Sequence, residues 1–186
     1  MGGRMHVADA QREIRSVYLG GSVGTLVSGV IWIISAALGT WVSISSAIFG
    51  LVIGGMFIFP VTMLALKAMA RKASLSRENP LGQLATQVAF TIPLAYPVIG
   101  AAAVHNINWF YPAFMVIVGA HYLPFVFLYG MWIYGVLAGL MVAGGWFVAN
   151  GASHSFTQGG WITGVMLVLF SLPIMLLGRE RARGAS

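Results

Sequence analysis

The sequence is poor in charge. Asp, Glu, Lys and Arg make up 8% of its 186 residues, against about 25% in soluble domains. The fourteen charged side chains all lie outside the 100-residue stretch from Asn79 to Gly178. An ionised group at the centre of a membrane-spanning helix costs about 2.5 to 3.5 kcal/mol. A stretch this long without one indicates a chain built for a lipid bilayer, which we expect to be its main partner.

Other absences exclude several kinds of chemistry. The chain has no cysteine, so disulfides, thiolate metal sites and thiol catalysis are excluded. Without an acid in the stretch from Asn79 to Gly178, no Ser-His-Asp set can form there. No glycine-rich phosphate-binding run follows a strand. Membrane hydrolases and nucleotide-driven pumps are therefore disfavoured, and no catalytic residue is assigned.

The chain has a net positive charge. Its formal charge is +6, but the basic residues adjoin hydrophobic segments, where they are suited to an anionic lipid leaflet. Nucleic acid is therefore not an expected partner.

A membrane-crossing helix needs about 20 apolar residues, and the sequence predicts six of them. The stretch from Trp109 to Ala149 has no polar break and would reach about 60 Å as one helix, twice the hydrocarbon thickness. We therefore expect a turn at Tyr129-Gly130. The expected helices cover residues 17–38, 43–66, 80–104, 110–128, 131–149 and 161–177. The fold class is an all-α membrane bundle, with residues 1–186 forming a single integral-membrane domain.

The basic residues also predict the orientation. All ten Lys and Arg fall in the N-terminal tail, the connection at 67–79 or the C-terminal tail. Cytoplasmic loops carry the excess of Lys and Arg, so both termini should face the cytoplasm from the inner membrane of a cell. An even number of crossings between the basic segments agrees with six spans.

Two local patterns leave alternatives open. Val7, Ala10 and Ile14 recur at helical spacing, which fits either a short interfacial helix or a solvated start of the first span; we favour the second. Small residues recur at every fourth position, which favours close helix packing, within the chain or between protomers. These stripes are Gly20-Gly24-Ser28 in the first span and Gly135-Gly139-Ala143 in the fifth.

The strongest candidate for a functional group is His121. An ionisable residue within a span is a functional-site hypothesis, and His121 lies about 10 Å from the inner end of the fourth span. Pro124 lacks the amide that would bond the Ala120 carbonyl, so an acceptor is freed beside the imidazole. Gln87 and Thr91 share one face of the third span, with Thr91 at a similar depth.

These features favour a small-solute or ion transporter or channel with a polar site in the third and fourth spans. The candidate ligand-binding residues are His121, Tyr122, Gln87, Thr91 and Pro124. Proline-interrupted helices around a polar group resemble transporter sites. The same groups could instead only bond helices together, so a non-transport scaffold or accessory subunit is the alternative. A second copy of the chain, in a homo-oligomer, is a further candidate partner.

A third alternative is a haem- or quinone-binding redox protein. Bis-histidine ligation needs two imidazoles at similar depth, but His105 and His154 belong to the predicted outer turns and His6 to the tail. None matches His121 in depth. His105 and His154 without a carboxylate make a weak metal site, so no metal is expected and no cofactor is assigned.

Several longer runs resemble a family of small bacterial multi-pass membrane proteins that carries only a domain-of-unknown-function label. The similar segments are Asp9-Ala10-Gln11-Arg12, Val27-Ser28-Gly29, Gly54-Gly55-Met56-Phe57-Ile58-Phe59-Pro60, Asn79-Pro80-Leu81 and Gly119-Ala120-His121-Tyr122-Leu123-Pro124-Phe125. The resemblance covers most of the chain. It implies a six-helix membrane protein without assigning an activity or a catalytic residue.

Overall fold

The computed structural model describes residues 5–69, 74–151 and 155–183, which form helices and their connections without any strand. Six helices are long and apolar enough to cross a membrane. In chain order the elements are α1 (Val7–Tyr18), the 3-10 turn η1 (Leu19–Gly21), α2 (Ser22–Trp41), α3 (Ile44–Ala68), α4 (Leu81–His105), the 3-10 turn η2 (Ile107–Trp109), α5 (Phe110–Tyr129), α6 (Ile133–Asn150) and α7 (Gln158–Arg183). The predicted all-α class with six membrane-length helices is confirmed.

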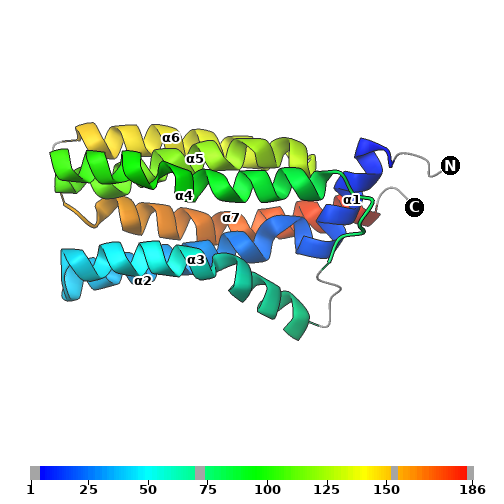
Figure 1. The fold of residues 1–186 in the computed structure, drawn as a ribbon, viewed down its shortest axis with the longest axis horizontal. Helices are drawn as coiled ribbons and strands as arrows, with labels where there is room; N and C mark the ends of the chain where they lie inside the picture. The colour runs from blue at the N-terminus through cyan, green and yellow to red at the C-terminus, as the bar shows by residue number, and fades with distance from the viewer. Residues whose placement is uncertain (1–4, 70–73, 152–154, 184–186) are drawn as a thin grey trace.

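The N- and C-terminal segments lie at the same end of the bundle (Figure 1). The connection between α3 and α4 and the turn between α5 and α6 lie there as well. We call this the basic end. The segments that join helices at the opposite, uncharged end contain no Asp, Glu, Lys or Arg. An even number of membrane crossings between consecutive basic segments would place all of them on one side of a bilayer, which agrees with this separation of charge.

Local sequence signals explain most of the helix ends. At the end of α5, Gly130 adopts a left-handed conformation with φ of 60°, which glycine tolerates without a steric cost. The turn lies where the sequence predicts it, although α6 begins at Ile133, two residues later than expected. At the start of α4, the Leu81 amide donates to Asn79 Oδ1 over 3.0 Å, so the Asn79 side chain satisfies one of the free amides of the first turn.

The preferred interpretation of the N-terminal segment is wrong. Instead of a solvated start of the first span, α1 is a separate helix that ends where Leu19 turns left-handed, with φ of 51°. Gly20 and Gly21 follow with φ of 67° and 88°. The apolar face of α1 packs inward, because Ala10 and Ile14 are almost fully buried. The first span is therefore α2, which begins at Ser22 rather than at residue 17.

The last helix is longer than the sequence predicts. We expected it over 161–177, but α7 runs from Gln158 to Arg183. Its added C-terminal turn carries Arg179, and cations there interact favourably with the helix dipole. The apolar run determines only which part of α7 can lie in lipid, and the helix itself continues beyond that part.

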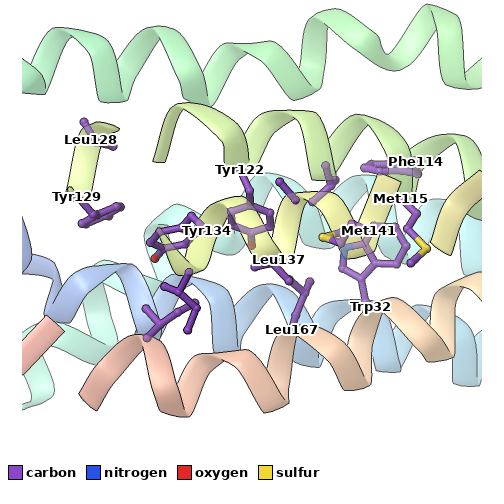
Figure 2. Packing of buried hydrophobic residues seen from close by; sticks show 14 of the residues in the cluster. Trp32, Phe114, Met115, Tyr122, Leu128, Tyr129, Tyr134, Leu137, Met141 and Leu167 are labelled. Carbon is purple, nitrogen blue, oxygen red and sulfur yellow. The ribbon is translucent and has the colours of Figure 1, made fainter. Parts of the chain in front are cut away.

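Three groups of helices form the bundle (Figure 1). In that view α7 lies between the α2–α3 pair and the group of α4, α5 and α6. Buried aromatic and aliphatic side chains fill the space between them. Figure 2 shows Trp32 of α2, Leu167 of α7 and Leu137 of α6 directed toward one another, and each is at most 2% exposed.

Glycines set the closest helix contacts. A Cβ atom placed on Gly29 of α2 would lie 2.9 Å from the Gly164 carbonyl oxygen of α7. Between α5 and α6, a Cβ on Gly145 would lie 2.8 Å from the Pro112 carbonyl oxygen. The small residues of α2 thus pack within the chain. The stripe in α6 behaves differently, because its central Gly139 is exposed and has open space beyond it.

Candidate functional site

His121 of α5 faces α4, and its imidazole contacts a polar side chain of that helix. Nδ1 of His121 lies 2.9 Å from Oγ1 of Thr91. The same hydroxyl lies 2.7 Å from the Val88 carbonyl oxygen, one turn earlier in α4. The structure therefore brings together His121 and Thr91, two of the five candidate residues. We call His121 and Thr91 the α4–α5 site.

The hydrogen-bond pattern determines which imidazole nitrogen carries the proton. A threonine hydroxyl has one hydrogen to donate, and a carbonyl can only accept. If both contacts are hydrogen bonds, Thr91 donates to Val88 and accepts from Nδ1–H of His121. This assignment follows from the network of contacts. It leaves Nε2 of His121 as an acceptor with a lone pair.

Gln87 lies one turn before Thr91, but among the described residues its amide makes no hydrogen bond to His121. Gln83, Gln87 and Thr91 are all exposed on the protein surface. In the part of the chain that the structure describes, Gln87 makes no side-chain hydrogen bond. The polar face of α4 is therefore at the edge of the α4–α5 site and extends onto the outer surface of the bundle.

Pro124 lies within α5, three residues after His121. Because proline has no amide hydrogen, the Ala120 carbonyl lacks its usual intrahelical donor. Pro93 has the same effect on the Ala89 carbonyl of α4. Each freed carbonyl is thus an acceptor within two residues of Thr91 or His121, and no Lys or Arg occurs between Asn79 and Gly178.

Tyr122 belongs to a different cluster from His121. Its side chain is 5% exposed and hydrogen-bonds to Thr25 and Ser28 of α2. Its ring stacks on Tyr134 of α6 with 5.8 Å between centroids (Figure 2). Adjacent positions in a helix point about 100° apart, which explains why one residue faces α4 and the next faces the core.

Tyr122, Tyr129 and Tyr134 form what we call the tyrosine cluster, next to the break between α1 and α2. The rings of Tyr129 and Tyr134 stack with 5.4 Å between centroids. The Tyr134 hydroxyl donates to the Gly20 carbonyl over 2.6 Å, so it satisfies an acceptor that the helix break exposes. Sequence analysis did not identify Tyr129 or Tyr134 as polar core residues, because tyrosine near a helix end is also typical of a membrane interface.

Helix α1 closes the basic end of the bundle through side-chain hydrogen bonds. Arg15 Nη1 donates to the Tyr129 carbonyl over 2.6 Å, and the Gln11 amide donates to the Phe127 carbonyl over 2.5 Å. Both acceptors lie in the last turn of α5, where helix carbonyls lack intrahelical partners. Arg15 and Gln11 therefore cap α5 from a helix more than one hundred residues away.

The carboxylate of Glu13 joins α1 to the connection between α3 and α4. It accepts from the Ser76 amide over 2.6 Å and from Asn79 Nδ2 over 2.8 Å. These partners could not be predicted from the sequence, because mixed charges in a tail are also typical of a solvated helix. Glu13 therefore links α1 to the α3–α4 connection at the basic end of the bundle.

The described residues offer no group of three His, Cys, Asp or Glu arranged to hold a metal ion. His105 ends α4 at the uncharged end, where its ring contacts Trp109 at 5.3 Å between centroids. His154 lies outside the described residues, so its suggested pairing with His105 stays untested.

Comparison with known proteins finds one family. A family model described as a family of unknown function (DUF7010) matches residues 7–177, from the first residue of α1 into α7. This match confirms the resemblance to a family without an assigned activity. No curated protein matches the chain, and no solved structure matches it.

Proposed function

The chain belongs to the DUF7010 family of unknown function, and we propose that it is a multi-pass membrane protein that binds and transfers a small polar solute at the α4–α5 site. The observation that carries this proposal is the hydrogen bond between His121 and Thr91, which leaves Nε2 of the imidazole as an acceptor. An imidazole held this way within a charge-free membrane segment is suited to a specific polar contact.

The residues around the site define the class of solute. Nε2 of His121 and the freed carbonyls of Ala89 and Ala120 are acceptors, so a suitable solute carries N–H or O–H donors. An anion is disfavoured, because no Lys or Arg lies between Asn79 and Gly178 to balance its charge. Urea and glycerol are small donor-bearing probes, and chloride is the matching anionic probe.

Replacement of His121 by leucine tests this function. In proteoliposomes containing the wild-type protein, we expect urea or glycerol to pass faster than in protein-free liposomes, with chloride unaffected. The His121→Leu variant should lower that permeability about tenfold, because one hydrogen bond in a dry site is worth roughly 1 to 3 kcal/mol. Stopped-flow light scattering measures the rate.

Two further variants separate function from folding. Thr91→Val should reduce permeability in the same direction, since it removes the group that orients His121. His105→Leu, a histidine at the uncharged end, should leave it unchanged. If the wild-type and His121→Leu proteins were equally permeable to urea and to glycerol, the proposal would be contradicted.

A non-transport scaffold is the second candidate, and one observation favours it. The Thr91 hydroxyl already satisfies one nitrogen of His121, so the pair could act only as a bond between α4 and α5. A scaffold should show no solute permeability above protein-free liposomes, and the His121→Leu protein should be folded and as stable as the wild type. The permeability of the proteoliposomes and the thermal stability of the His121→Leu protein therefore distinguish the candidates.

A further inference from the structure

Among the described residues, the face of α4 opposite α5 is left exposed by the other helices. Of the six membrane-length helices, α4 has the smallest fraction of buried residues in its most apolar segment. We define the α4 outer face by five exposed residues at three- or four-residue spacing: Gln87, Phe90, Leu94, Val98 and Ala101. Leu94, at its centre, is 76% exposed. This spacing places all five residues on one face of the helix, where a second helix could pack.

Gln87, the polar member of the α4 outer face, distinguishes it from an ordinary lipid-facing surface. Gln87 is exposed, lies about 9 Å along α4 from Leu81, and makes no side-chain hydrogen bond within the described residues. Hydrocarbon offers an amide no donor or acceptor, so leaving Gln87 in lipid is unfavourable. A partner that presents an amide at the same depth would remove this cost.

A second copy of the chain meets that requirement by symmetry. All copies insert in the bilayer with the same orientation, so a twofold axis along the membrane normal places Gln87 of both copies at one depth. A carboxamide is its own complement, because each has donors and an acceptor. We propose that the α4 outer face is a homodimer interface in which the two Gln87 amides hydrogen-bond to each other.

Two other exposed faces of the described helices carry no polar side chain that needs a partner in lipid. The Gly135-Gly139-Ala143 stripe of α6 is a small-residue surface without an unpaired polar side chain. The exposed part of α3 around Phe57 is apolar, and lipid chains can cover it without loss. The α4 interface does not depend on the proposed solute binding, since it follows from Gln87 and not from His121.

The absence of cysteine from the chain makes the interface directly testable. In lipid vesicles, a Leu94→Cys variant should form disulfide-linked dimers on mild oxidation. Phe57→Cys on α3 and Leu140→Cys on α6 are matched controls, because both wild-type side chains are exposed within their helices. These two should stay largely monomeric on oxidation. Stronger cross-linking at either control, or none at Leu94→Cys, would overturn the proposal.

The role of the amide has its own test. Gln87→Leu should raise the dimer dissociation constant about three- to tenfold, the effect of one or two hydrogen bonds between membrane helices. Gln83→Leu, one turn closer to the helix end and to interfacial water, should change it less than twofold. The two constants can be measured by single-molecule photobleaching at varied lipid dilution. Equal constants for Gln87→Leu and the wild type would exclude the amide pair.

Discussion

Replacement of Gly29 by valine is expected to destabilise the bundle strongly. A Cβ on Gly29 would lie 2.9 Å from both the Gly164 carbonyl oxygen and the Val168 backbone nitrogen. Backbone atoms cannot rotate away, so α2 and α7 would have to separate along their contact. We expect a loss of stability of at least about 3 kcal/mol, at the upper end for overpacking in a core.

Thermal unfolding in detergent, together with the yield of monodisperse protein, measures this loss. Gly139→Ala is the matched control, because a Cβ there meets open space and alanine is a better helix former than glycine. That variant should unfold at the wild-type temperature or slightly above it. If Gly29→Val were as stable as Gly139→Ala, the close contact between α2 and α7 would be wrong.

The second large effect is expected at the break between α1 and α2. Gly21 has φ of 88°, a conformation that costs an alanine roughly 1 to 2 kcal/mol. Its Cβ would also overlap the Tyr134 hydroxyl and lie 3.0 Å from that of Tyr129. Displacement of Tyr134 would break its hydrogen bond to the Gly20 carbonyl. Gly21→Ala should therefore destabilise the protein by about 3 kcal/mol.

Gly24→Ala, three residues further along the chain in α2, provides the comparison. Its Cβ would lie 3.6 Å from Thr62 Oγ1, which is an ordinary contact, and Gly24 lies in regular helix. We expect unchanged or slightly higher thermal stability for this variant. Similar unfolding temperatures for Gly21→Ala and Gly24→Ala would show that Gly21 does not adopt the left-handed conformation.

The sequence predicts the membrane helices well because the bilayer imposes simple requirements on them. Length, apolar composition and the position of charge determine where a span can lie. The end of α1 at Leu19 could not be predicted in this way. A left-handed leucine has no propensity signal, and the apolar spacing of Ala10 and Ile14 fits a buried helix as well as an interfacial one.

The candidate site was predictable only in part. Equal depth suggested that Thr91 and His121 belong together, and the structure places them in contact. Tyr122 was grouped with His121 because it is adjacent in sequence, whereas adjacent helical positions face different neighbours. The partners of Gln11, Glu13 and Arg15 depend on where α1 docks, which local patterns do not encode.

The membrane account as a whole rests on the positions of the chain ends and of the turns between helices. Because the chain lacks cysteine, single cysteines can be placed in the N-terminal tail, in the connection between α3 and α4, in the C-terminal tail and in η2. A membrane-impermeant thiol reagent applied to sealed vesicles of known orientation then reports the side of each. The account predicts that the first three react from one face and η2 from the other. Reaction of the two chain ends from opposite faces would contradict it.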